Sequence, residues 1–230
     1  MKTTIKTYFQ KALFIFALAG VTFLQSCIED ENLCLTGSGV VNEYDISITQ
    51  FDKISISGPV NLRIKQGSVQ KVTVFAEPEL MQPIRYKVVS GELEIGYDNN
   101  ITCFNTNFGV WIVITVPDIN EIQASGENII ESDGDLDLDN LFINAEGKST
   151  MNLKGKVNSQ TIFSSGQTVV NNFNLLTQST TLDISGEGNL EVSCEEELDI
   201  DVDGVSTISY KGNPSITQKV SGTLNLIDAN

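Results

Sequence analysis

Apolar and polar residues alternate along most of the chain, with the period of two that is typical of a β-strand with one buried face. The pattern is clearest around Gly186. Leu182 and Ile184 stand four and two residues before this glycine, and Leu190 and Val192 stand four and six residues after it. The glycine and its neighbours interrupt the alternation, which is typical of a turn. This stretch therefore predicts two short strands joined by a tight turn.

The same arrangement recurs along the chain. From Gly126 to Gly222 the spacings between successive glycines of this kind are 21, 19, 20, 18 and 18 residues. The full set is Gly58, Gly126, Gly147, Gly166, Gly186, Gly204 and Gly222. The residue four positions after each glycine is apolar in every case: Leu62, Ile130, Met151, Val170, Leu190, Ile208 and Leu226. Three positions after the glycine a polar residue is common, as at Asn61, Thr150, Asn189, Thr207 and Asn225.

A short repeat of this kind predicts an all-β solenoid, because each unit is too small to bury its own apolar face. We expect a right-handed parallel β-helix with coils of about 18–21 residues, stacked so that their apolar faces form one column. The polar Asn and Thr positions are expected to form a hydrogen-bonded ladder beside the turns. The alternative is a β-sandwich with regular hairpins, and the even register of the repeat favours the solenoid.

Residues 37–117 carry strand patterns that are less regular than those of residues 118–230. We interpret 37–117 as an irregular β-rich N-terminal cap with the first coil, and 118–230 as the β-helix repeats. Within the cap, residues 79–84 lack strand spacing and predict a helical turn. Residues 98–109 are predicted to form a polar loop.

Residues 1–26 have the features of a signal peptide, with three lysines ahead of a short apolar stretch from Ala12 to Phe23. The stretch ends in Leu24-Gln25-Ser26-Cys27, which resembles the lipobox of bacterial lipoproteins. The resemblance implies cleavage before Cys27 and lipidation of that residue, so that acyl chains hold the protein on a membrane. The alternative is a plain signal peptide followed by a chance cysteine.

Residues 27–36 are interpreted as an acidic tether. Glu29, Asp30 and Glu31 directly follow the lipidated cysteine and resemble the surface-export signal of some Gram-negative lipoproteins. The resemblance implies attachment to the outer membrane and favours the cell surface over the periplasm. The alternative is a solvated tether without a sorting role.

The chain is strongly acidic, with a formal net charge of −16. Removal of the signal takes three of the 14 basic residues and none of the 30 acidic residues, which leaves a net charge of −19. This charge argues against nucleic acid and against an anionic lipid surface as partners.

Three cysteines remain beside Cys27. Cys194 continues the alternation of Leu190 and Val192 and is expected in the core. Cys34 and Cys103 lie outside the regular repeats, and the exported chain meets an oxidising compartment. We therefore predict a disulfide that joins the leader to the 98–109 loop.

The composition argues against catalysis and predicts no cofactor or metal. The sequence has no histidine, and therefore no imidazole base and no histidine metal ligand. Two aspartate rows alternate with apolar residues and are expected to face solvent: Asp133, Asp135, Asp137, Asp139, and Asp199, Asp201, Asp203. A calcium site is the alternative, but Leu138 stands where an EF-hand needs glycine and Asn144 where it needs glutamate.

A succession of short motifs resembles the head GIN domain family, which is labelled as putative autotransporter adhesins, over roughly residues 37–227. The motifs are Phe51-Asp-Lys-Ile-Ser-Ile-Ser-Gly58, Gln66-Gly67, Val72-Thr-Val74, Gly91-Glu-Leu-Glu-Ile95, Ile114-Thr-Val-Pro117, Gln123-Ala-Ser-Gly126, Asp183-Ile-Ser-Gly-Glu-Gly188 and Tyr210-Lys-Gly-Asn-Pro214. The resemblance implies a β-helical bacterial domain that is secreted or lipid-anchored. It brings no catalytic or ligand-binding residues with it.

Two functions fit these observations. The first is a surface-anchored, non-catalytic protein that binds a glycan or a protein, and the second is a structural envelope lipoprotein without a soluble ligand. A polysaccharide-acting enzyme is a remote third. Phe104 and Phe108 mark the 98–109 segment as a candidate ligand loop, although the same aromatics could fold onto the cap. Trp111 and Tyr210 are interpreted as core residues rather than sugar platforms.

Overall fold

The structure is a computed structural model, and it describes residues 33–97 and 101–230. The chain separates into two units, Met1–Glu31 and Asn32–Asn230. The described residues lie in the second unit and are mostly in strands, with one short helix among them. No described helix is long and apolar enough to cross a membrane.

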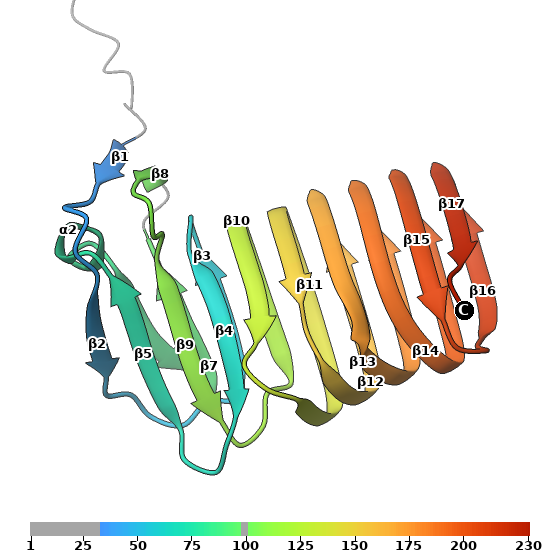
Figure 1. Ribbon diagram of the computed structural model, residues 1–230, viewed down its shortest axis with the longest axis horizontal. Helices are drawn as coiled ribbons and strands as arrows, with labels where there is room; N and C mark the ends of the chain where they lie inside the picture. The colour runs from blue at the N-terminus through green and yellow to red at the C-terminus, as the bar shows by residue number, and fades with distance from the viewer. Residues whose placement is uncertain (1–32, 98–100) are drawn as a thin grey trace, which may run out of the picture. The chain divides into compact units, whose positions relative to one another are not determined.

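The C-terminal half is a parallel β-helix, as the sequence predicts (Figure 1). Its strands are β10 (Glu121–Ser132), β11 (Leu136–Asn152), β12 (Gly155–Ser164), β13 (Gln167–Ile184), β14 (Glu187–Val202), β15 (Val205–Lys211), β16 (Ser215–Val220) and β17 (Thr223–Asp228). Equivalent residues of successive coils pair in parallel. Glu121 pairs with Phe142, Gln167 with Glu187, and Glu187 with Val205, which gives coils of about 20 residues.

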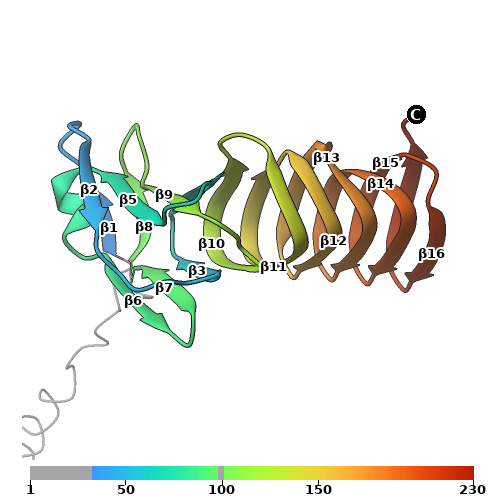
Figure 2. The same cartoon turned by 90° about the horizontal axis from the view of Figure 1, so that it is seen from below.

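Each coil contributes to more than one face of the β-helix (Figure 2), because the longest strands bend from one face to the next. One face, which we call the first face, contains 121–125, 142–145, 161–164, 181–184, 199–202 and 217–220. The second face follows the repeat glycines and contains 127–131, 148–151, 167–172, 187–192, 205–210 and 223–228. The coils therefore stack face on face in register.

The core is a set of apolar columns that run from coil to coil. Ile122, Ile143, Ile162, Leu182 and Ile200 form one column behind the first face. Ile130, Met151, Val170, Leu190 and Ile208 form another behind the second face. Nearly all of these side chains are fully buried. Each contributes roughly 1.5–3 kcal/mol of hydrophobic stabilisation before conformational entropy is subtracted.

The order of coils in space differs from their order in the chain at the N-terminal end. Strands β3 (Lys53–Ser57) and β4 (Asn61–Gln66) pair in parallel with β10 and form the coil before it. Strands β7 (Glu92–Gly96) and β9 (Trp111–Val116) come later in the sequence, yet they pair in parallel with β3 and β4 on the far side. The parallel ladder thus extends two coils beyond β10.

Segment 117–120 connects β9 to β10 and crosses the β3–β4 coil, which lies between them. Hydrogen bonds to residues of that coil fix both ends of the segment. The Gln66 Nε2 atom donates to the carbonyl oxygen of Pro117 at 3.0 Å. The backbone N–H of Asn120 donates to the carbonyl oxygen of Asp52 at 2.8 Å, and its side-chain Nδ2 to Asp52 Oδ2 at 3.1 Å.

Antiparallel strands and one helix complete this end. Strand β5 (Lys71–Ala76) pairs with β9, β2 (Asn42–Ile46) with β5, and β6 (Arg85–Val89) with β7. The expected helical turn is helix α2 (Pro78–Met81), whose Leu80 is fully buried. The Tyr97 hydroxyl donates to the carbonyl oxygen of Leu80. Burial raises the pKa of Tyr97, so this phenol stays protonated and keeps its donor role.

The expectation that the 98–109 segment forms a loop is wrong in part. Strand β8 (Ile101–Asn105) lies within it and pairs in parallel with β1 (Leu33–Thr36). These two strands form a separate two-stranded sheet. The strand pattern of Ile101 and Cys103 is too short to distinguish from a loop when its partner lies 68 residues earlier in the chain.

Candidate binding groove

The outer surface of the second face is organised in columns of side chains. One column, which we call the central column, consists of Ile129, Thr150, Val169, Asn189, Thr207 and Asn225. Its members alternate with buried core residues and therefore point outward. Glu127, Lys148, Gln167, Glu187 and Val205 form the neighbouring column on the same face.

The polar positions thus stack as predicted, but the expected hydrogen-bonded ladder is largely absent from this column. Among the described residues, the bond that involves a predicted ladder position is from the Ile129 N–H to Asn61 Oδ1, at 2.9 Å. Side-chain bonds between coils occur instead in adjacent columns, where Asn171 Nδ2 donates to Asn152 Oδ1 at 2.8 Å. Thr and Val side chains in the central column cannot continue an amide ladder.

Two shallow cavities lie over these columns. One, of about 380 Å³, is lined by Val169, Asn189 and Val205 among others. The second, of about 470 Å³, extends toward the N-terminal end and includes Asn61, Phe104 and Ile129. Both are lined by Lys148 and Thr150, so they adjoin. We call the combined depression the second-face groove.

The groove presents hydroxyl, amide and methyl groups along its centre, because the central column has no charged residue. Its charges are few. Lys148 Nζ lies 2.6 Å from Glu127 Oε1 and offsets that charge, whereas Glu187 Oε2 accepts a hydrogen bond from the neutral Gln167 Nε2 at 3.1 Å and keeps its charge. The first face differs, since Asp199 and Asp201 face outward there as predicted, and the exposed Asp203 follows in the next turn. The groove is therefore a weakly charged surface on a strongly acidic chain.

Asn128 ties the groove to the preceding coil. Its side chain is buried beneath the turn, and its Nδ2 atom donates to the carbonyl oxygens of Gly58 and Val60, at 3.0 and 2.8 Å. This amide gives a side-chain donor to two carbonyl groups of the turn, one of which, that of Gly58, also accepts from the Val60 N–H at 3.0 Å. The contact fixes the position of Ile129, the first residue of the central column, relative to β4.

The structure separates the two aromatic residues of the predicted ligand loop. The Phe104 ring packs edge-on against Tyr97, with ring centroids 4.9 Å apart, and forms part of the groove wall. It lies against the core, as the folded-loop alternative expects. Phe108 is 52% exposed and is not a lining residue of the groove. Cys27, the predicted lipidation site, lies outside the described residues.

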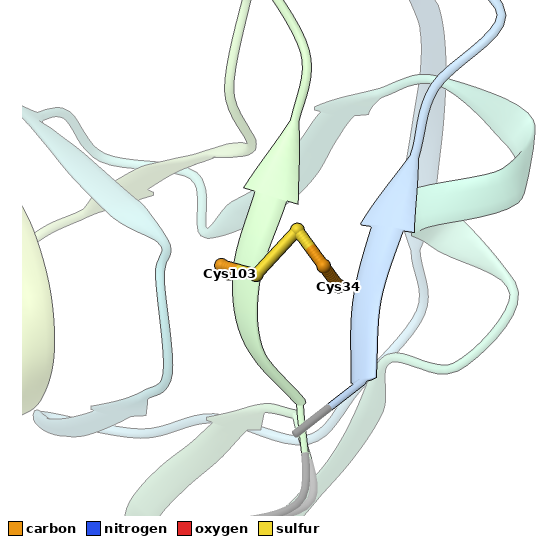
Figure 3. The surroundings of a disulfide bond; sticks show 2 residues. All are labelled: Cys34 and Cys103. Atoms are coloured by element: carbon orange, nitrogen blue, oxygen red, sulfur yellow. A yellow bond between two sulfur atoms is a disulfide. The ribbon is translucent and has the colours of Figure 1, made fainter. Parts of the chain in front are cut away.

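Cys34 and Cys103 are joined in the structure, with their Cα atoms 4.7 Å apart (Figure 3). The bond links β1 to β8, and Cys103 also lines the groove. The wall of the groove is therefore attached covalently to the start of the folded unit. Cys194 is a buried free thiol, as its register predicts.

The interpretation of Trp111 as a core residue is wrong. Trp111 alternates with the buried Ile112 and lies on the outer side of β9, half-buried. The Arg63 guanidinium stacks 4.6 Å from the ring centroid and also bonds to Glu131 Oε1 at 2.5 Å. The alternation of the strand could have revealed this side chain. Tyr210 packs partly buried against the core, as expected.

The described residues contain no group of three His, Cys, Asp or Glu side chains placed to hold a metal ion.

The carboxyl groups whose pKa values are clearly shifted have lowered pKa values. Bonds from Lys71 and Thr73 hold the pKa of Asp45 below its usual range, and bonds from the backbone and Ser38 do the same for the pKa of Glu79. These groups stay ionised at neutral pH, whereas a general acid needs a raised pKa.

Comparisons with known proteins support the fold. A family model described as "Putative auto-transporter adhesin, head GIN domain" matches residues 50–214. No curated protein matches the chain.

The chain is also similar to crystal structures of putative adhesins. One from Bacteroides fragilis is 22% identical with a TM-score of 0.66, over 84% of this chain and all of the other. Those from Parabacteroides distasonis and Parabacteroides merdae are 18% and 17% identical, with TM-scores of 0.57 and 0.52. They cover 85% of this chain in both cases, and 100% and 99% of their own length. At these identities the likeness shows a shared fold.

Proposed function

The chain belongs to the head GIN domain family of putative auto-transporter adhesins, and we propose that it is a lipid-anchored cell-envelope protein that binds a glycan or protein ligand without catalysis. The second-face groove is the surface that holds the ligand. The lipid on Cys27 anchors the protein to the outer membrane of a Gram-negative cell. The acidic residues Glu29, Asp30 and Glu31 direct the protein to the cell surface.

The groove is the observation that carries the binding role. It spans several coils and is lined mainly by short polar and aliphatic side chains. An extended ligand can lie along the central column and exchange hydrogen bonds with Thr150, Asn189 and Thr207 while it covers Val169. Repulsion of an acidic ligand is reduced there, because Lys148 offsets the charge of Glu127 and the central column is uncharged. A rigid solenoid holds these positions in place, which reduces the entropic cost of binding.

The anchor and the surface location are tested together on intact cells. Externally added protease should cleave the wild-type protein while a periplasmic marker stays intact. Replacement of Glu29, Asp30 and Glu31 by alanine should leave the protein attached to the envelope but protected from the protease. Cys27→Ala should abolish incorporation of labelled fatty acid. Protection of the wild-type protein would instead favour the structural envelope role.

Binding is tested with residues 28–230 on arrays of glycans and host-surface proteins. Val169→Asp places a charge at the centre of the groove on a side chain that is 36% exposed, so the fold should tolerate it. We expect this variant to lose the ligand. The matched control is Val89→Asp on β6, where the side chain is 45% exposed. Strand β6 pairs with β7 and contributes no residue to the groove. Equal binding by both variants would remove the groove from the proposal.

A further inference from the structure

Two phenylalanines form a solvent-facing pair on the first face of the β-helix. The ring centroids of Phe142 and Phe163 are 5.3 Å apart, with the ring planes tilted by 37°. The Phe163 side chain is 37% exposed. Phe142 alternates with the buried Ile143, and Phe163 with the buried Ile162. Both rings therefore point away from the core, and the core does not need them.

The strand register shows what surrounds the two rings. Phe142 pairs with Thr161 on the next coil, and Asn144 pairs with Phe163. These four outward side chains form a square in which the rings occupy one diagonal and Asn144 and Thr161 the other. Diagonal neighbours of this kind are within reach of aromatic side chains. We call this set the aromatic square.

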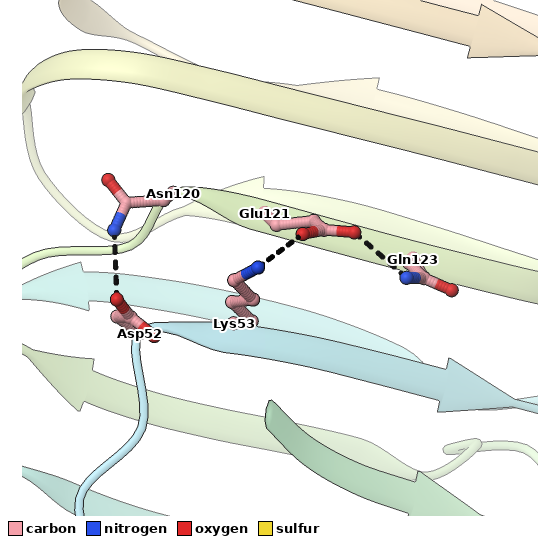
Figure 4. Close-up of polar contacts among 5 residues, drawn as sticks. All are labelled: Asp52, Lys53, Asn120, Glu121 and Gln123. Atoms are coloured by element: carbon pink, nitrogen blue, oxygen red, sulfur yellow. Dashed lines mark hydrogen bonds and ion pairs between the residues drawn. The ribbon is translucent and has the colours of Figure 1, made fainter. Parts of the chain in front are cut away.

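Polar groups border the square on the preceding coil. Glu121 pairs with Phe142, and Gln123 pairs with Asn144. Gln123 Nε2 donates to Glu121 Oε1 at 2.9 Å, and Lys53 Nζ lies 3.1 Å from Glu121 Oε2 (Figure 4). These contacts hold the side chains of this border in defined positions.

The border on the following coil comes from β13. Thr181 pairs with Thr161, and Asp183 pairs with Phe163. The square is thus an aromatic surface of two tilted rings between two rows of hydroxyl, amide and carboxyl groups. This combination is typical of sites where an apolar ring face is covered while hydroxyl groups at its edge are hydrogen-bonded.

We propose that the aromatic square is a carbohydrate subsite that takes a neutral pyranose unit of a glycan. The apolar face of the sugar packs on Phe142 and Phe163, and its hydroxyl groups bond to Asn144, Thr161 and the two polar borders. Anionic sugars are disfavoured, because Asp183 and the surrounding acidic chain repel them. The proposal rests on the proposed function for a glycan as ligand, and it adds a second binding surface that is separate from the second-face groove.

A cross-strand aromatic pair can also serve stability alone. The two roles make different predictions about substitution. If the pair only stabilises the sheet, removal of one ring lowers the melting temperature and does not change glycan affinity. If the square is a binding surface, removal of the exposed ring lowers affinity in a protein that remains folded.

The test uses residues 28–230 and measures retardation in gels that contain soluble neutral glucan, mannan or galactomannan, with polygalacturonate as the anionic comparison. We expect the wild type to be retarded by at least one neutral polysaccharide and not by polygalacturonate. Calorimetry with the matching oligosaccharide gives the affinity. Phe163→Ala should weaken it about tenfold or more, the scale of one lost stacking contact. Phe108→Ala removes another exposed ring and should leave the affinity unchanged.

Several outcomes would overturn the inference. It fails if no neutral polysaccharide retards the wild type, or if Phe163→Ala binds as tightly as the wild type. Phe163→Leu keeps apolar volume without a flat ring, so full affinity in that variant also contradicts stacking. A glycan that Phe163→Ala retains and Val169→Asp loses would bind in the groove, which would preserve the proposed function and reject this subsite.

Discussion

The α-carbon of Gly186 lies directly against the carbonyl oxygen of Gly166 on the preceding coil, where an added Cβ atom would come within 2.0 Å of that oxygen. The same close approach occurs at the next two turns. A Cβ atom added to Gly204 would come within 1.8 Å of the carbonyl oxygen of Gly186, and one added to Gly222 within 1.9 Å of that of Gly204. The backbone N–H of Glu187 donates to the oxygen of Gly166 at 2.9 Å. The repeat glycines at these turns are therefore required by stacking between coils.

Gly186→Ala should destabilise the β-helix by ~3 kcal/mol, because the methyl group meets backbone atoms that cannot rotate away. Gly188→Ala is the matched control two residues later, where strand β14 has begun. Its added methyl group would meet the ends of the Leu190 and Ser206 side chains, which can move, so we expect a loss of only ~1 kcal/mol. Chemical denaturation of both variants measures the difference. Equal losses would mean that the coils can separate at the turn without cost.

The register of the second face can be tested at two neighbouring positions. Leu190→Asp places an unpaired charge in a fully buried position of the core column and should cost roughly 3–5 kcal/mol. Glu191→Lys changes an outward side chain and should alter stability by less than ~0.5 kcal/mol. Thermal melting of the two variants provides the comparison. Similar melting temperatures would contradict the assignment of inward and outward residues.

The sequence predicts the β-helix well because its repeat encodes two facts at once. The alternation gives the buried face of each strand, and the glycine spacing gives the length of each coil. The alternation alone therefore places Ile143, Leu190 and Cys194 in the core, where all three are buried. The outward position of Phe163 follows from the same rule, since it stands an odd number of residues before Gly166.

The order of the N-terminal coils could not be predicted in the same way. Alternation shows which side of β7 or β9 is buried, but it does not identify the strand that pairs with it. The placement of β7 and β9 beyond β3 and β4 depends on long-range pairing and on contacts such as that of Asn120 with Asp52. The groove is not predictable for a related reason, because its residues come from several coils and share no local motif.

The link between Cys34 and Cys103 predicts a simple thiol count for residues 28–230 produced in an oxidising compartment. The folded, unreduced protein should react slowly with a thiol reagent, because its free cysteine, Cys194, is buried. Unfolding without reductant should expose one thiol, and unfolding after reduction should expose three. Two or more thiols in the unreduced, unfolded protein would contradict the bond. Cys34→Ser combined with Cys103→Ser should lower stability by ~2–4 kcal/mol, since the bond closes a long loop.

The ion pair at the border of the aromatic square predicts a pH-dependent contribution to stability. The hydrogen bond from Gln123 and the interaction with Lys53 hold the pKa of Glu121 below its usual value of 4.5. A carboxyl group with a lowered pKa in the folded state stabilises the protein above the unfolded-state value, and this contribution is lost as the pH falls through the folded-state pKa. Glu121→Gln should therefore reduce the free energy of unfolding at pH 7 by less than ~1 kcal/mol, since the Lys53 side chain is 43% exposed and solvent screens the pair. As the pH falls below 4.5 and through the lower folded-state pKa, the variant and the wild type should converge.

Denaturant titrations of both proteins across this pH range measure the difference between them, which removes the general effect of discharging an acidic chain. Lys53→Met provides the control, because it deletes the partner and leaves the carboxyl group. In that background the Glu121→Gln substitution should cost less at pH 7, as a double-mutant cycle requires for an interacting pair. A difference that grows as the pH falls would contradict the lowered pKa. A cost that Lys53→Met does not change would assign the stabilisation to Gln123 alone.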